Sequence, residues 1–112
     1  MTTSPFCQKT VDVENRSFLV MILKFDNGNF VSISEGSANL GSMVVSLSTG
    51  PTPITTTVIP AKTDSLFLKL TAERISTMSK GIAIVSTNVK NELKSDTAKI
   101  LMTEIMEMVR NV

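Results

Sequence analysis

The sequence predicts an α+β fold in two layers, with a roughly six-stranded, mainly antiparallel sheet and two helices on one face. Short apolar runs that alternate with polar residues fill the first half of the chain, and turn residues separate them, as is typical of strands. Two segments with helical periodicity follow, and a further apolar run lies between them. A chain of 112 residues can bury one modest core, so we expect residues 1–112 to form a single domain.

The central strand is predicted at Phe18–Phe25, the most continuously apolar run in the chain and too short for a core helix. An earlier strand is expected at Phe6–Val13, before a compact polar turn. Alternation makes both faces of the central strand apolar, with Phe18, Val20 and Ile22 on one and Leu19, Met21, Leu23 and Phe25 on the other. Each such side chain gains roughly 1.5–3 kcal/mol on leaving water, so we expect both faces to be covered.

After the central strand, Asn27 and Gly28 favour a tight hairpin because both residue types tolerate positive φ. The chain is then expected to return antiparallel. This strand and the later ones are expected at Phe30–Ser34, Ser42–Ser48, Pro53–Ile59 and Ile82–Val89. The resulting order is five strands, a helix, a strand and a helix, which is most simply arranged as a sheet with both helices on one side.

The first helix is expected from Asp64 to Met78, after an N-cap at Thr63 and Asp64 that also gives an acidic first turn. Gly81 stands where a C-terminal capping glycine is common. The apolar side chains of this helix span about two-thirds of its circumference, so it is wedged either between two surfaces or against the neighbouring helix. The last helix, Asp96–Arg110, has a narrower methionine-rich stripe, which is typical of core packing on one surface.

Composition argues against several classes of function. The net charge is +1 and there is no Trp or Tyr, which disfavours nucleic acid as a partner. No apolar stretch approaches the ~20 residues that cross a bilayer, so no membrane partner is expected. The absence of His removes the commonest general base and metal ligand, so we expect neither enzyme activity nor a cofactor. The single cysteine, Cys7, fits a reducing compartment inside the cell.

Nothing in the predicted chain remains to cover the second face of the sheet. Two helices cover one face, so the missing layer is most simply a second polypeptide. Between Glu35 and Lys62 there is no charged residue, which indicates either a hydroxyl-rich solvated surface or a face packed against another protein. We therefore predict a partner-binding surface formed by Leu19, Met21, Leu23, Ser46, Thr55 and Thr57.

Four strings between about residues 17 and 108 resemble a known family. They are Phe18–Phe25, the run from Asn39 to Leu47, the proline-led hydroxyl-rich strand Pro53–Ile59, and Ile82–Val89, which ends in a Ser-x-Asn-aliphatic pattern. Together with the order of elements, they resemble the small proteasome assembly chaperones of the type-three and type-four class, and type four most of all.

The resemblance implies a non-catalytic chaperone that forms a heterodimer with a related type-three subunit. Such a pair promotes assembly of the 20S proteasome alpha-subunit ring and leaves before the particle matures, with the alpha type 5 subunit as the implied contact. The implied location is the cytoplasm, with the nucleus as a second compartment.

Two other classes compete with this interpretation. A roadblock-like or longin-like dimeric adaptor in signalling or trafficking also combines a small sheet with helices, but such folds usually place a helix before or between the early strands, and none is predicted before Asp64. An enzyme would need converging polar groups, yet Asp12, Glu14, Asp26 and Glu35 all fall at strand ends or turns. No glycine-rich phosphate loop is present either.

Overall fold

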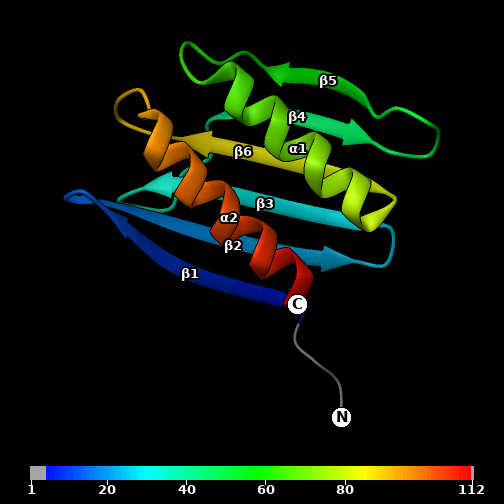
Figure 1. The fold of residues 1–112 in the computed structure, drawn as a ribbon, viewed down its shortest axis with the longest axis horizontal. Helices are drawn as coiled ribbons and strands as arrows, with labels where there is room; N and C mark the ends of the chain where they lie inside the picture. Colours follow the sequence, from blue (N-terminus) through cyan, green and yellow to red (C-terminus); the bar gives the residue numbers. More distant parts are fainter. Residues whose placement is uncertain (1–4, 112) are drawn as a thin grey trace.

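The computed structural model describes residues 5–111 and contains strands and helices in the predicted order (Figure 1). The elements are β1 (Phe6–Val13), β2 (Arg16–Phe25), β3 (Gly28–Glu35), β4 (Ser42–Leu47), β5 (Ile54–Ile59), α1 (Ser65–Ser79), β6 (Ile82–Asn88) and α2 (Ser95–Asn111). All six strands join one sheet and both helices lie on one side of it, so the predicted fold class is confirmed. Among the described residues, no helix is long and apolar enough to cross a membrane.

The sheet has the strand order β1-β2-β3-β6-β4-β5. Neighbouring strands are antiparallel except β3 and β6, which run parallel. Because β6 lies between β3 and β4, the connection from β3 to β4 must pass across one end of β6. This crossing brings residues 36–41 to one end of the sheet, where they form part of the surface described below.

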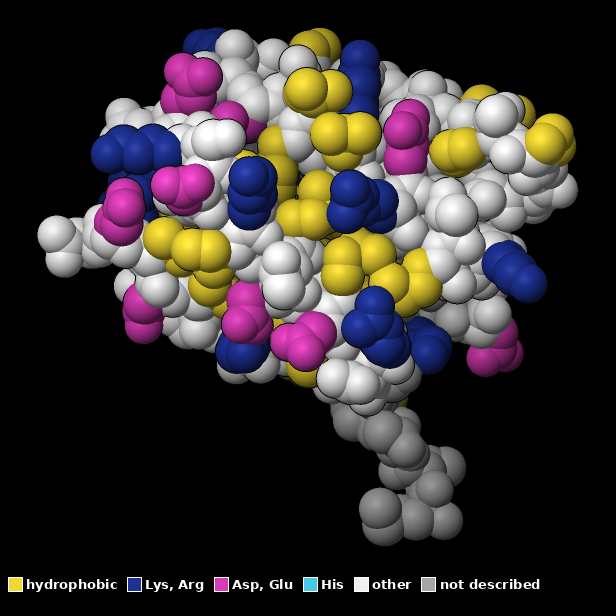
Figure 2. All heavy atoms as spheres, viewed as in Figure 1, with side chains coloured by type: hydrophobic (Ala, Val, Ile, Leu, Met, Phe, Trp, Pro, Cys, Tyr) yellow, Lys and Arg dark blue, Asp and Glu magenta, His cyan; other side chains and the backbone are white. Residues whose placement is uncertain are grey.

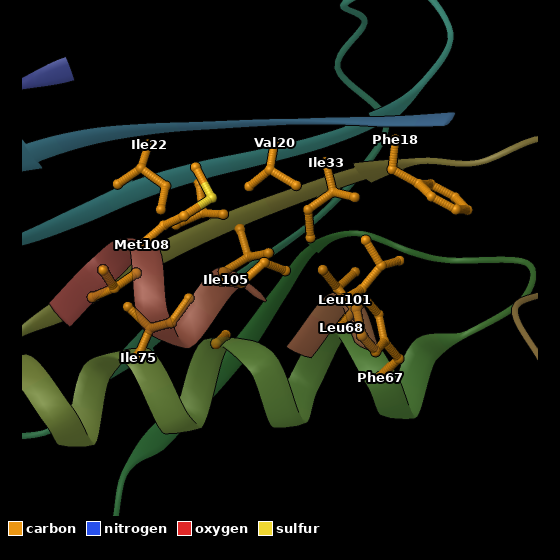
Figure 3. Close-up of a cluster of buried hydrophobic side chains, with 14 of the residues drawn as sticks. Phe18, Val20, Ile22, Ile33, Phe67, Leu68, Ile75, Leu101, Ile105 and Met108 are labelled. Carbon is orange, nitrogen blue, oxygen red and sulfur yellow. The ribbon is translucent and has the colours of Figure 1, made fainter. Parts of the chain in front are cut away.

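The hydrophobic core lies between the sheet and the helices (Figure 3). As alternation along β2 predicts, Phe18, Val20 and Ile22 all point into it and are fully buried. α1 contacts β4 and β6, whereas α2 contacts β1 and β2, so together the helices span the width of one face. They contribute Phe67, Leu68 and Ile75 from α1 and Leu101, Ile105 and Met108 from α2.

The tight hairpin between β2 and β3 is present, but the predicted reason for it is wrong. Phe25 pairs with Gly28, and neither Asn27 nor Gly28 has positive φ. The positive pair is Glu14 and Asn15 in the turn between β1 and β2, with φ of 48° and 67°. Gly28 is needed for space, because a Cβ there would lie 2.2 Å from the carbonyl oxygen of Ile82 on the neighbouring strand.

The ends of α1 also differ from the prediction, because long-range contacts fix them. The helix begins at Ser65, and Asp64 has φ of 61° and makes no side-chain cap. Instead, both carboxylate oxygens of Asp64 accept from the backbone N–H of Leu93, at 3.2 Å. At the other end Lys80, not Gly81, takes the left-handed conformation. A Cβ on Gly81 would lie 2.3 Å from the Asn27 carbonyl oxygen, so this glycine permits close packing of two loops.

Candidate protein-protein interface

The face of the sheet opposite the helices, here called the open face, carries the second set of alternating side chains. Strand register places these side chains next to one another: Leu19, Met21, Leu23 and Phe25 on β2; Phe30, Ser32 and Ser34 on β3; Ile82, Ile84 and Ser86 on β6; Met43, Val45 and Leu47 on β4; Ile54 and Thr56 on β5. Within the described residues, no helix covers them. The chain therefore leaves a largely apolar sheet face without a second layer.

Few charges interrupt this surface. Asp12 of β1 is the one charged side chain that the register of the described strands places on the open face. In a sheet with one solvated face, each strand normally alternates apolar residues that point into the core with polar or charged residues that point into solvent. Here Leu23 is 37% exposed and Phe25 is 54% exposed, and uncharged neighbours surround them. The open face therefore has the composition of a surface that is buried against another protein.

A shallow apolar hollow of about 290 Å³ lies on the β1–β3 side of the open face. Its walls are Phe6, Met21, Leu23, Phe30, Ser32, Ala38, Asn39 and Leu40. A second hollow of about 200 Å³ continues between Phe25, Phe30 and Ile84 toward β6. These two hollows are depressions in the open face into which apolar side chains of a partner can insert.

The crossing loop of residues 36–41 forms one wall of the larger hollow, and buried serines hold it in place. The Ser34 hydroxyl donates to the Asn39 carbonyl at 2.9 Å and accepts from the Asn39 N–H at 3.1 Å. The Ser86 hydroxyl accepts from the Gly41 N–H at 3.0 Å. These hydrogen bonds explain why two open-face serines are buried without a helix above them. Leu40 is left projecting, 62% exposed, at the rim.

The structure brings together three of the six residues predicted to bind a partner. Leu19, Met21 and Leu23 lie in one row on the open face. Ser46, Thr55 and Thr57 lie on the helix side of β4 and β5, because they alternate along these strands with the residues that point to the open face. The expectation that all six share one surface is therefore wrong.

Two hydroxyls of β4 and β5, those of Ser46 and Thr55, are used inside the chain, under α1. Ser46 is fully buried, and its Oγ lies 3.2 Å from Thr55 Oγ1 and 3.0 Å from Ser76 Oγ. Thr55 in turn donates to the Glu73 carboxylate at 2.9 Å. A chain of hydroxyls thus satisfies polar groups between the sheet and the helix. The charge-free segment between Glu35 and Lys62 therefore does not present all its side chains to a partner. Its strands β4 and β5 point alternate side chains toward α1 and toward the open face.

Sequence reasoning did not assign several residues of the open face to the predicted partner-binding surface. Phe30 pairs with Leu23 across the predicted hairpin, so the sequence held the signal that could have assigned it. Ile84 and Val45 were recognised as strand residues, but their places beside Phe30 follow only from the strand order, in which β6 is inserted. Phe6 joins them because it pairs with Leu23. Leu40 lies in a loop, where no periodic pattern marks it.

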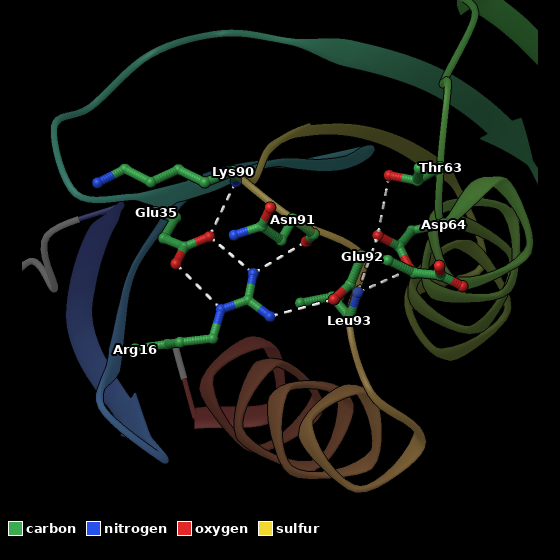
Figure 4. A network of polar contacts seen from close by, with 8 residues as sticks. All are labelled: Arg16, Glu35, Thr63, Asp64, Lys90, Asn91, Glu92 and Leu93. Atoms are coloured by element: carbon green, nitrogen blue, oxygen red, sulfur yellow. Dashed lines mark hydrogen bonds and ion pairs between the residues drawn. The ribbon is translucent and has the colours of Figure 1, made fainter.

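The charged cluster at one end of the sheet has a structural role (Figure 4). Arg16 donates from Nε and Nη2 to the Glu35 carboxylate at 3.0 and 2.8 Å, and it also donates to the carbonyls of Asn91 and Glu92. The Lys90 N–H adds a third hydrogen bond to Glu35, at 2.9 Å. The Arg16 guanidinium, and then the Lys90 N–H, hold the pKa of Glu35 below its ordinary value. The cluster ties β2 and β3 to the segment before α2.

Within residues 5–111, no group of three or more potential metal ligands converges. No protein-family model matches the chain, and no curated protein matches it. Among solved structures, the chain is similar to a chain in the crystal structure of a novel chaperone complex for yeast 20S proteasome assembly. The TM-score is 0.67 at 15% sequence identity, and the match covers 96% of this chain and 99% of that chain. The two chains therefore share a fold over nearly their whole lengths.

Proposed function

We propose that the protein is a non-catalytic chaperone subunit that pairs with a related small chaperone through its open face and supports assembly of the 20S proteasome. The observation that carries this proposal is the open face itself, which is apolar, nearly free of charge and uncovered by the described chain. The shared fold with a chain of a yeast proteasome assembly chaperone complex supports the choice of chaperone over other binding proteins.

The open face is large enough to support a stable pair. The two longer dimensions of the molecule are 36 and 34 Å and lie in the plane of the sheet, as Figure 1 shows. The footprint of the face is therefore on the order of 1,000 Å², compared with about 800 Å² per partner in a standard interface. Two such sheets packed face to face, about 10 Å apart, would form a sandwich with helices on both outer sides.

The family resemblance of the sequence supports a more specific form of the proposal. The chain resembles type four most closely, so the paired subunit is a type-three chaperone and the pair is a heterodimer. The client, meaning the protein whose assembly is assisted, is the proteasome alpha ring, with the alpha type 5 subunit as the contact. The pair acts in the cytoplasm and also in the nucleus.

Affinity purification of the tagged full-length chain from its own cells, followed by mass spectrometry of stoichiometric bands, tests this proposal. We expect a second small chaperone together with free proteasome alpha subunits and no mature beta subunits. A small GTPase or a membrane-trafficking complex in their place would support the roadblock-like or longin-like adaptor and refute the chaperone. A folded monomer with no partner would refute the pairing itself.

A charge placed on the open face tests whether pairing uses this surface. In Met21→Lys the ammonium would be buried without a partner at the interface, which costs several kcal/mol and should abolish co-purification of the paired subunit. Thr57→Lys is the control, because Thr57 is exposed on the helix side of the edge strand β5. Both variants should fold as well as the wild type, judged by thermal melting. If Met21→Lys pairs normally, the open face is not the interface.

A further inference from the structure

A further apolar hollow lies on the helix side of the molecule, between α1 and α2. It has a volume of about 500 Å³ and is lined by Leu66, Phe67, Leu70, Arg74, Ser95, Ala98, Lys99, Met102 and Thr103. A smaller hollow of about 390 Å³ shares Leu70 and Arg74 with it and extends along α1 to Met78 and Met106. Together they form a groove along the two helices, and Figure 2 shows hydrophobic side chains gathered there with Lys and Arg side chains beside them.

Phe67 belongs to the core and Met102 packs against it, but the core does not account for Leu66 and Leu70, which also line this groove. α1 packs on the sheet through Phe67, Leu68 and Ile75. Leu66 is 68% exposed and Leu70 is 41% exposed, and their spacing of four residues places both on one side of the helix, facing the groove. The wide apolar arc that the sequence predicts for α1 is thus divided between the core and this exposed stripe. The half-buried Met102 of α2 adds a flexible apolar side chain on the opposite wall.

Two cations, Arg74 and Lys99, line the larger hollow of the groove. Among the described residues, the side chains of Arg74 and Lys99 make no ion pair and no hydrogen bond. No acidic side chain lines the larger hollow, whereas Glu73 lines the smaller one, where its carboxylate accepts a hydrogen bond from Thr55. The larger hollow therefore offers an apolar floor with two free cations, which is complementary to a segment with apolar and acidic side chains.

We propose that the groove between α1 and α2 is a docking site for an amphipathic, acidic segment of the client protein. A helical segment places apolar side chains at intervals of three and four residues along such a groove, and its flanking carboxylates would reach Arg74 and Lys99. The groove and the open face are on opposite sides of the sheet, so a client and a paired chaperone can be bound at once. The inference deepens the proposed function and, in identifying the bound segment as the client's, rests on it.

A designed peptide tests the chemistry of the groove without any proteasome subunit. The probe is a fluorescent amphipathic helix with leucines on one side and glutamates flanking them, and its partner probe has lysines in place of the glutamates. Fluorescence anisotropy is measured with the full-length chain. We expect saturable binding of the acidic probe, at least about tenfold tighter than that of the basic probe.

Charge-reversal variants test whether the acidic probe binds in the groove. Arg74→Glu combined with Lys99→Glu should weaken binding of the acidic probe by about tenfold or more, because two attractions become repulsions. Lys69→Glu makes the same kind of charge change on the exposed surface of α1, outside the groove, and should leave binding within about twofold. Since all three residues are exposed, these variants should melt like the wild type.

The outcomes separate this inference from the proposed function. Equal binding of the two probes, no saturable binding, or equal binding by the groove variant and the wild type would overturn the groove assignment. In that case, co-purification of alpha subunits with the chain would leave the proposed function standing. If the acidic probe binds as described but no alpha subunit co-purifies, the groove stands as a site for acidic segments and its proposed client is wrong.

Discussion

Replacing Glu35 with Gln should lower the free energy of unfolding by about 2–4 kcal/mol near neutral pH. The Glu35 carboxylate accepts from Arg16 Nε, Arg16 Nη2 and the Lys90 N–H, at 3.0, 2.8 and 2.9 Å. The side chains of Arg16 and Glu35 are only 19% and 10% exposed, so solvent screens the pair weakly. Hydrogen bonds to charged groups contribute roughly 1.5–3 kcal/mol each, but Gln keeps one carbonyl acceptor and the contributions are not additive.

The assay is denaturant unfolding followed by far-UV circular dichroism, because the chain has no Trp or Tyr to report by fluorescence. Glu92→Gln is the matched control: it removes the same charge from an exposed side chain in the neighbouring segment, and we expect a change within about 0.5 kcal/mol. If Glu35→Gln is no less stable than this control, the cluster does not stabilise the fold and the reasoning fails.

The pKa of Glu35 makes this contribution dependent on pH. Because the folded pKa is lowered, the stabilisation is fully present above the unfolded value of about 4.3 and is lost as the pH falls through the folded value. The difference in unfolding free energy between wild type and Glu35→Gln should therefore be largest near neutral pH and shrink in acid. A difference that stays constant from neutral pH into acid would contradict the assignment of the shift to the folded-state ion pair.

Two further changes test the packing. Gly81→Ala should cost about 1–3 kcal/mol of stability, because the added Cβ would lie 2.3 Å from the Asn27 carbonyl oxygen. Gly50→Ala is the control and should change stability little, because no atom lies within 4 Å of the added Cβ. Equal effects of the two substitutions in thermal melts would refute the argument that Gly81 is needed for space. Ile105→Ala removes a fully buried side chain between α2 and the sheet and should cost about 2–5 kcal/mol, whereas Ile100→Ala, at a position 44% exposed on the same helix, should cost less than about 1 kcal/mol. Similar losses in denaturant unfolding would mean that α2 does not pack as described.

The strands and helices could be predicted because their signals are local. Alternation in Phe18–Phe25 identified both the core row and the open row of β2, and helical periodicity located α1 and α2. The strand order could not be read in the same way, because β6 is inserted between β3 and β4 by contacts that are distant in sequence. For the same reason, Gly28 and Asp64 were assigned local roles, whereas their real partners are Ile82 and Leu93.

The candidate site was half predictable. Leu19, Met21 and Leu23 could be predicted because side chains alternate along β2: once the residues between them are known to lie in the core, these three must lie on the open face. For β4 the alternation was equally clear, but the polar row of Ser46 faces α1, while the apolar row of Val45 faces outward. Hydroxyls can be buried in a core as well as at an interface when they pair with one another, as Ser46 does with Thr55 and Ser76. Composition alone cannot distinguish these two uses.

The most direct test of the account is whether a second protein covers the open face. A photo-reactive amino acid at position 21, in the middle of this face, is compared in cells with the same residue at position 69, on the exposed surface of α1. The account predicts that position 21 cross-links in high yield to one small chaperone partner and that position 69 does not cross-link to that partner. If position 69 gives the partner adduct and position 21 gives none, the pair forms elsewhere and the open face is not the interface.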